Sequence, residues 1–392
     1  MNRDRINRLL NQVPVHVIVL LTILIWIVPT LGLLVTSLRP PEAVRTSGWW
    51  TVINTQNAGG PYAQHCAACH GADGRAIPQA DLTNPELIAK YPRSLQLLAL
   101  LRKEINGQPH MGDNPLPSPQ EAAEIATFLR QGEQTGSQFT FDNYIDALVG
   151  YRGQSTYRAD CAAGTQPPDI KCNLSDILNP RGMGRAFINS LLVTLPATFI
   201  PILFAAFAGY AFAWLDFKGR FLLFALLVGL QVVPLQMTLV PISRFYAQVG
   251  LNGTFLGVWL FHTGFGMPYA IYLMRNFLGT LPRDLFESAY LDGASHWTAF
   301  RQLVIPLAMP AIASLGIFQF LWVWNDLLVA LVFLGGTTPV MTYQISNMVT
   351  SLGSGWQVLT AAAFLSMLLP MIVFFSLQRY FVRGMLAGAV KG

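Results

Sequence analysis

Charged residues are scarce in this chain. Only 11% of its 392 residues are Asp, Glu, Lys or Arg, and 53% are hydrophobic. Soluble globular proteins carry about 25% charged residues, so the composition excludes an ordinary soluble protein and indicates a membrane protein. The net charge of +5 is small and requires no nucleic-acid partner to explain it.

Cysteine is also scarce, and the common nucleotide-binding motif is missing. Four cysteines are too few for a scaffold held together by disulfides. The sequence contains no Walker A motif, G-x-x-x-x-G-K-[S/T], so the chain does not bind and hydrolyse ATP by that route.

Long apolar stretches are plentiful, and a helix of about 20 apolar residues crosses a bilayer. The predicted spans are 15–38, 186–215, 221–243, 254–274, 306–334 and 358–377. The first exceeds the roughly 7–15 apolar residues of a signal peptide and is expected to remain uncleaved. Six spans predict that both termini lie on the same side of the membrane.

Basic residues in short loops indicate on which side of the membrane the termini lie, because Lys and Arg are enriched in cytoplasmic loops. Those on the terminal side are Arg3, Arg5, Arg8, Lys218, Arg220, Arg275, Arg283, Arg301, Arg379, Arg383 and Lys391. The short loops opposite offer only Arg244. Both termini are therefore predicted to be cytoplasmic, with residues 51–185 in the periplasm if the source is a Gram-negative bacterium.

Residues 51–185 are polar, rich in Gly and Pro, and too long for an ordinary connection, so they should hold a separate domain. We expect residues 1–50 to be a tail and first span, 51–137 a small helical insertion, and 138–185 a connection. The membrane core follows as 186–392. Within the insertion, a helix is predicted to begin near Ser118 and to end near Gly132.

The insertion contains Cys66-x-x-Cys69-His70, which is typical of covalent haem attachment. The two thiols would bond the haem vinyl groups, and His70 would bind the iron. Met111 is the candidate second iron ligand, with His110 as the alternative. A redox dithiol or half of a zinc site would also use a cysteine pair. However, neither a thioredoxin-like pattern nor a second ligand pair follows.

This layout resembles small class-I c-type cytochromes, which have a haem motif near the start, a methionine loop and a C-terminal helix. The family usually has Pro after the methionine, whereas Gly112 stands here. The resemblance implies covalently bound haem c and a redox partner of unknown identity. Later in the same segment, an oxidising compartment favours a Cys161–Cys172 disulfide over a second metal site.

The segment 281–312, "LPRDLFESAYLDGASHWTAFRQLVIPLAMPAI", predicts two short helices joined by a turn. Pro282 and Asp284 suit the first turn of one helix, Gly293 suits its left-handed stop, and Ser295 can cap the next. From composition alone this is a capped amphipathic connection.

As a pattern the segment resembles the EAA motif of binding-protein-dependent ABC importer permeases. In that family the loop, here 275–305, docks into a cleft of the ATPase subunit. The resemblance assigns this coupling role to Glu287, Ala289, Asp292, Gly293 and Ala294. Only Ser288, in the place of a common Ala, departs from the motif.

Other stretches resemble the second permease subunit of maltose and α-glucoside importers. They are 48–50, 139–144, 262–277, 318–334 and 377–392, and the resemblance covers residues 1–50 and 139–392. It implies an all-α, six-helix permease of the type I ABC importer fold. A small all-α cytochrome c-like domain would be inserted in its first periplasmic loop, where exposed chain tolerates insertions.

The same resemblance implies a transport subunit of a bacterial inner membrane, not an enzyme, that imports α-glucosides or other disaccharides. Its partners would be a second permease subunit, an ABC ATPase dimer and a periplasmic sugar-binding protein, within the lipid bilayer. A membrane-anchored c-type cytochrome is the alternative function. That function usually requires paired histidines across the spans, and only His16 and His262 are present there.

Asn325 and Asp326, beside Trp322, are the candidates for the substrate path. An ionisable residue within a span is a functional candidate by default, and aromatic rings suit sugar faces. Pairing with a neighbouring helix, or capping of a helix break, is the alternative for Asp326. The residues expected to form hydrogen bonds between helices are Gln231, Gln236 and His262.

Overall fold

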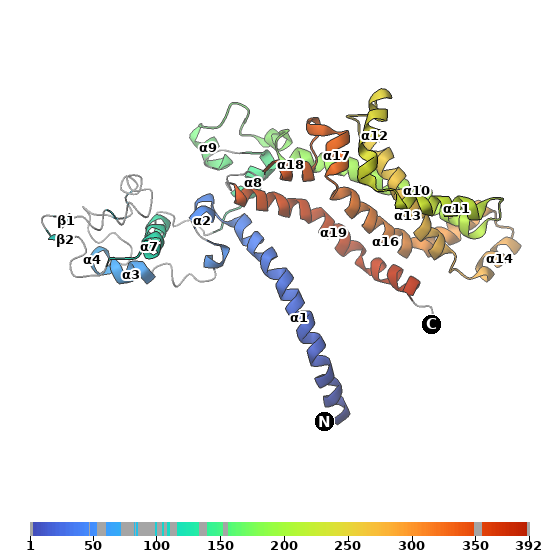
Figure 1. Ribbon diagram of the computed structural model, residues 1–392, viewed down its shortest axis with the longest axis horizontal. Helices are drawn as coiled ribbons and strands as arrows, with labels where there is room; N and C mark the ends of the chain where they lie inside the picture. Colours follow the sequence, from blue (N-terminus) through green and yellow to red (C-terminus); the bar gives the residue numbers. More distant parts are fainter. Residues whose placement is uncertain are drawn as a thin grey trace. The chain divides into compact units, whose positions relative to one another are not determined.

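The computed structural model describes residues 3–46, 48–52, 60–71, 82, 84, 99, 104–105, 108–109, 116–132, 139–151, 156–348 and 355–389. The chain divides into two compact units, 1–143 and 144–392. The described residues are mostly helical (Figure 1). Within this described part of the chain, the strands are one short antiparallel pair, β1 (Glu104–Ile105) with β2 (Gln108–Pro109).

The first unit contains one long helix, α1 (Arg3–Leu38), and several short ones. The short helices are α2 (Pro41–Thr46), η1 (Trp49–Val52), α3 (Gly60–His65), α4 (Ala67–His70) and α7 (Pro119–Gly132). A capping box begins α7, because Ser118 N donates to Glu121 Oε2 (2.7 Å) and Glu121 N donates to Ser118 Oγ (3.2 Å). The predicted helix from Ser118 to Gly132 is therefore confirmed.

Residues 139–143 return to the end of α1. Thr140 N donates to Leu38 O (2.6 Å), and Asn143 Nδ2 donates to the carbonyls of Ser37 (2.9 Å) and Arg39 (2.7 Å). Ser37, Arg39 and Asn143 are buried. These bonds join the chain before and after residues 51–137 at one point of the first unit, which is called the junction below.

Four long helices pack against one another in the second unit (Figure 1). They are α10 (Met183–Trp214), α13 (Phe255–Leu278), α16 (Ile305–Trp324) and α19 (Trp356–Ala389). Glycines let them approach closely. A Cβ at Gly209 would lie 2.7 Å from Met274 Cβ, and one at Gly266 would lie 2.6 Å from Gln319 Nε2. Small residues at crossings are the usual basis of helix packing in membranes.

Side-chain to main-chain hydrogen bonds also connect these helices. Gln319 Nε2 donates to Ala197 O (3.2 Å), and Trp324 Nε1 donates to Ser366 O (3.0 Å). Such bonds satisfy backbone carbonyls that have no water partner in a bilayer. Large apolar side chains face outward instead, including Phe199 and Phe221, which are 66% and 86% exposed.

The structure has a long apolar helix at four of the six predicted spans, and the one predicted at 306–334 ends earlier, at Trp324. The helices long and apolar enough to cross a membrane are Val13–Leu38, Met183–Trp214, His296–Trp324 and Trp356–Tyr380. The segment predicted as a span at 254–274 forms the helix α13, which is not among these four, and the polar residues His262 and Thr263 lie within it.

The predicted span at 221–243 is not one straight helix. It consists of α11 (Arg220–Gly229) with η4 (Leu230–Val232), followed by α12 (Leu235–Gln248), with a bend of 98° between them. Pro234 explains the break, because a residue before proline is disfavoured in the helical region. Val233 is accordingly extended, with ψ of 116°. Counting this pair as one span gives five among the described residues.

The second unit also contains the short helices α9 (Tyr157–Ala163) and η3 (Leu174–Leu178) and is entered through α8 (Asp142–Val149). Cys161 and Cys172 are joined by a disulfide bond. Within η3, the buried carboxylate of Asp176 accepts hydrogen bonds from Lys171 N (3.1 Å) and Asn173 N (3.2 Å). It also accepts one from Tyr157 Oη (3.1 Å).

We expect acid to loosen this disulfide-bonded segment. Burial alone would raise the pKa of Asp176, but the donors from Lys171, Asn173 and Tyr157 hold that pKa below its usual value. Because the folded-state pKa is lowered, the stabilisation is complete above about pH 4 and is lost as the pH falls through the lower folded value. Hydrogen exchange at Lys171 and Asn173, measured from pH 7 downward, should accelerate in that range beyond the intrinsic chemical rate. In the D176N variant this extra pH dependence should be absent, and its persistence would contradict the assignment.

Candidate functional site

A pocket of about 680 Å³ lies in the second unit where two helix breaks face each other. One break is the bend at Pro234, and the other separates α16 from α17 (Leu328–Phe333). The lining residues are Gln231, Val233, Pro234, Leu235, Gln236, Phe265, Trp322, Asn325, Asp326, Leu327 and Leu328. Interrupted helices expose backbone and polar side chains at membrane depth, and they are common features of transporter binding sites.

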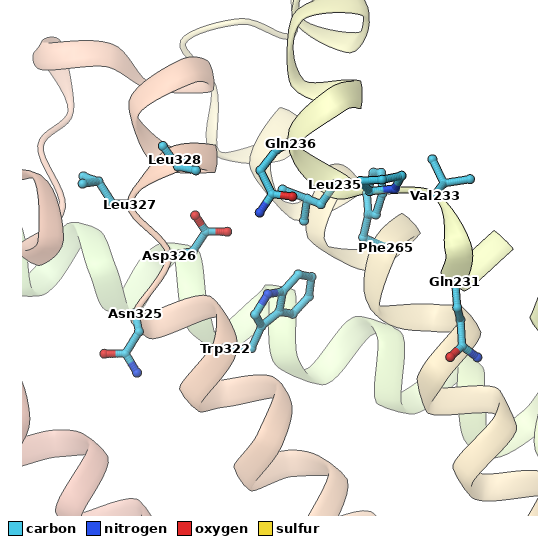
Figure 2. A pocket seen from close by; sticks show the side chains of 11 residues that line it. Gln231, Val233, Leu235, Gln236, Phe265, Trp322, Asn325, Asp326, Leu327 and Leu328 are labelled. Carbon is cyan, nitrogen blue, oxygen red and sulfur yellow. The ribbon is translucent and has the colours of Figure 1, made fainter.

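Three side chains converge in this pocket. Figure 2 shows the Asp326 carboxylate and the Gln236 amide pointing toward the same space, with the Trp322 ring beside it. One oxygen of Asp326 accepts a hydrogen bond from Val329 N (3.0 Å), which fixes the carboxylate at the start of α17. Asp326 therefore caps the helix break, as one prediction had it, and also lines the pocket.

Asn325 also lines the pocket, but its side chain is oriented differently. Its side chain points away from Asp326 and Gln236 in Figure 2, and its Nδ2 donates to Leu321 O (2.8 Å) at the end of α16. Trp322 and Asp326 therefore lie together in the pocket, whereas the Asn325 amide group donates its hydrogen bond to a main-chain carbonyl.

Gln231 and Gln236 are predicted from the sequence to form hydrogen bonds to other helices. In the structure both line the pocket, on either side of Pro234. Two glutamines flanking a proline within an apolar run are the signal that could have revealed them. His262 was also predicted to bond another helix. It is buried with its ring 5.1 Å from that of Trp322, and its Nδ1 has no hydrogen-bond partner among the described residues.

The predicted pair of short helices is present as α14 (Arg283–Leu291) and α15 (His296–Ala299), which leads through the π-turn η5 (Phe300–Val304) into α16. Gly293 is in the left-handed region with φ of +84°, and Ser295 Oγ accepts a hydrogen bond from Thr298 N (3.2 Å). Pro282 precedes the first helical residue. The capping and stop signals read from the sequence are therefore confirmed.

One face of α14 is buried and the other is open. Phe286 is buried, and its ring stacks on Trp214 at a centroid distance of 3.8 Å. Glu287, Asp292 and Gly293 are exposed, while Ala289 and Ala294 are half-buried beside them. Leu291 is 89% exposed. The open face of α14 and the turn that follows it are therefore accessible.

The Cys66–Cys69–His70 motif forms a single helical turn. Cys69 N and His70 N both donate to Cys66 O, at 3.2 and 2.9 Å. Both sulfurs are free thiols, that of Cys66 in a buried residue and that of Cys69 in an exposed one. Burial, together with the charge of Cys69, raises the pKa of Cys66 to about 11.

Helix α7 covers this turn. Tyr62 is buried, stacks on Phe128 of α7 at 4.5 Å, and donates its hydroxyl hydrogen to Gly71 O (2.7 Å). Cys66 packs with Ile125 in the same cluster. Met111 and His110 lie outside the described residues. Within the described part of the chain, no three His, Cys, Asp or Glu side chains gather as a metal site.

Comparison with known proteins gives two family matches. Residues 186–387 match the family described as "Binding-protein-dependent transport system inner membrane component". Residues 54–129 match "Cytochrome C oxidase, cbb3-type, subunit III". The first match covers the four-helix core and the α14–α15 loop, and the second covers the Cys66–Cys69 turn and most of α7.

Individual relatives agree with the first match. The chain is 44% identical to the alpha-glucoside transport system permease protein AglG of Rhizobium meliloti, over 96% of this chain and 97% of that one. It is 63% identical to the osmoprotective compounds uptake permease protein GgtD of a Synechocystis species, over 56% and 74%. It is 30% identical to the melibiose/raffinose/stachyose import permease protein MelC of Bacillus subtilis, over 58% and 83%.

Proposed function

This chain belongs to the family of binding-protein-dependent transport system inner membrane components, and from that premise we propose that it passes neutral sugars, principally α-glucosides, through an ATP-driven importer. The pocket between the two helix breaks is the observation that carries the proposal. Among the described residues that line it none is Lys or Arg, and Asp326 is its one charged side chain. An acidic solute would be repelled there, whereas hydroxyl groups can donate to Asp326 and bond Gln236. The Trp322 ring offers an apolar face to a sugar ring.

The α14–α15 loop supplies the connection to ATP. Its exposed residues Glu287, Asp292 and Gly293 would dock on an ATPase subunit, with Ala289 and Ala294 shaping the turn beside them. The complete importer would contain a second permease subunit, two ATPase subunits and an external sugar-binding protein in the inner membrane. This chain would carry out no chemistry itself, since the ATPase subunits would hold the nucleotide.

Transport by the reconstituted importer tests the pocket. We expect W322A to lower import of labelled maltose about tenfold, because an aromatic contact worth roughly 1.4 kcal/mol is lost. W322F, which keeps a ring, should retain most of the import. Trp26 of α1 is 77% exposed, so W26A is the matched control and should import normally.

Competition between unlabelled solutes and labelled maltose identifies the substrate class. Unlabelled α-glucosides should compete with maltose, while a β-glucoside should not. An osmoprotective solute belongs in the panel because one relative is named for such compounds. Equal import by W322A and W322F, with both complexes intact, would refute the pocket assignment. No import of any sugar by the wild-type complex would refute the proposed function.

We also propose that residues 51–137 form a c-type cytochrome domain. The support is the cytochrome family match at 54–129, the two free thiols one helical turn apart, and the helix α7 packed over that turn. Cys66 and Cys69 would hold the haem covalently, with His70 as one iron ligand and Met111 or His110 as the other. When bound, the haem would supply one-electron redox chemistry.

An absorption spectrum tests the haem. The chain purified from a host that matures c-type cytochromes should show a sharp α-band on reduction, and the C66S/C69S variant should lack it. Replacing Met111 and His110 singly should identify the second ligand through a changed spectrum. A wild-type chain without covalent haem would refute the cytochrome proposal and leave the transport proposal intact.

An electron-transfer protein anchored by membrane helices is the weaker candidate. The permease family match covers 186–387, including the α14–α15 loop, for which an electron carrier has no use. Electron transfer through the spans would also need paired histidines, and His262, one of the two in the predicted spans, is buried against the Trp322 ring.

A further inference from the structure

Three ring side chains meet where the α14–α15 loop joins the core. The Tyr210 hydroxyl lies 2.9 Å from the Tyr290 hydroxyl, and His296 Nδ1 lies 3.3 Å from the first and 3.0 Å from the second. All three polar atoms are therefore within hydrogen-bond distance of one another. Each residue comes from a different helix: α10, α14 and α15.

The three residues connect the exposed loop with the interior. Tyr210 is only 5% exposed and lies about one turn before the end of α10. His296 is exposed and begins α15, and Tyr290 stands just before the turn that contains Gly293. Helix α10 packs against α16, which carries Trp322 of the pocket. A force on the loop can thus reach the pocket through Tyr210 and α10.

Apolar packing already holds the loop against the core. Phe286 stacks on Trp214, and Phe300 stacks on Phe207 at 4.6 Å. Stacked rings can slide over one another because offset stacking is favourable over a range of displacements. Hydrogen bonds fix both distance and direction. The Tyr210–Tyr290–His296 cluster is therefore suited to setting the register of the loop on α10, and folding does not depend on it alone.

Resting on the proposed function, we propose that Tyr210, Tyr290 and His296 act as positioning residues that make the α14–α15 loop and α10 move together, so that ATP hydrolysis is converted into sugar import. Without the cluster, the loop would still dock on the ATPase, since its exposed face is unchanged. Its movement would be partly absorbed by sliding of the aromatic stacks.

The test uses the whole importer in proteoliposomes and measures the sugar imported per ATP hydrolysed. We expect Y290F, which keeps the ring and removes the hydroxyl, to lower this ratio about three- to tenfold, as loss of a hydrogen bond worth roughly 0.7–1.4 kcal/mol implies. H296L should do the same. H296N should restore coupling, because an amide group can occupy the place of Nδ1. Tyr269, 42% exposed on α13, provides the matched control Y269F.

Three outcomes are distinguishable. A lowered ratio in Y290F and H296L, with normal ATPase co-purification and recovery in H296N, supports the proposal. An unchanged ratio in Y290F and H296L overturns it, and so does loss of the ATPase from these complexes, which would indicate a purely structural role. Failure of the wild-type complex to import sugar would refute the proposed function instead. The cluster would then be judged by whether Y290F changes the ATPase rate of the assembled complex, and an unchanged rate would overturn it.

Discussion

Replacing Gly293 by valine is expected to lower sugar import about tenfold while the chain stays folded in the membrane. Gly293 has φ of +84°, and the left-handed region costs a residue with a Cβ roughly 1–2 kcal/mol. The turn also carries two main-chain hydrogen bonds, from Gly293 N to Tyr290 O (3.0 Å) and from Ala294 N to Ala289 O (2.9 Å). A changed turn would displace Tyr290 and His296 and alter the face proposed to meet the ATPase.

Gly219 provides a matched control for this variant. It has φ of +81°, and, as at Gly293, a Cβ added there meets no atom within 4 Å. G219V thus imposes the same backbone strain in a different loop and should leave import close to normal. G293N should also retain more import than G293V, because asparagine tolerates the left-handed region. Equal losses in G219V and G293V would attribute the effect to general destabilisation and contradict the prediction.

Replacing Asn143 by alanine is expected to destabilise the first unit by about 2 kcal/mol or more. Its side-chain nitrogen donates to the carbonyls of both Ser37 and Arg39. Leaving a buried acceptor without its donor costs roughly 1–3 kcal/mol, and two acceptors are affected. Thermal unfolding or limited proteolysis of the purified chain should show the loss.

Two further variants separate loss of the donor from loss of volume. N143D keeps the size but supplies only acceptors, so it should be at least as damaging as N143A. Asn252, which is exposed and donates to Ser243 O at 3.0 Å, provides the control N252A. If N143A and N252A unfold alike, the junction contributes no more than a surface contact.

Local capping chemistry could be predicted from the sequence. Ser118, Gly293 and Ser295 mark helix ends through their own backbone and side-chain hydrogen bonds, which depend on neighbours a few residues away. The disulfide partners and the four most apolar spans could be recognised for the same reason, because a short segment carries the whole signal. The resemblance to the EAA motif around Gly293 also suggested what this turn does, namely that it contacts an ATPase subunit.

Features built by distant residues could not be predicted. The pocket requires Gln236 at one helix break to face Asp326 at another, and sequence periodicity does not record which breaks meet. The bend itself was missed because an apolar run through Pro234 has the composition of a straight span. Asn143 bonds to residues 104 and 106 positions away, so its role depends on the fold.

The junction makes this part of the chain a suitable place for exchanging domains. Because Thr140 and Asn143 bond directly to the end of α1, the two ends of the intervening sequence are held at neighbouring points. A gene segment coding for almost any compact module whose own termini lie close together could be exchanged there in a single step. The order and orientation of the membrane helices would not change. Redox proteins, binding modules or fluorescent reporters could thus be fused to the same permease without redesign of its transport helices.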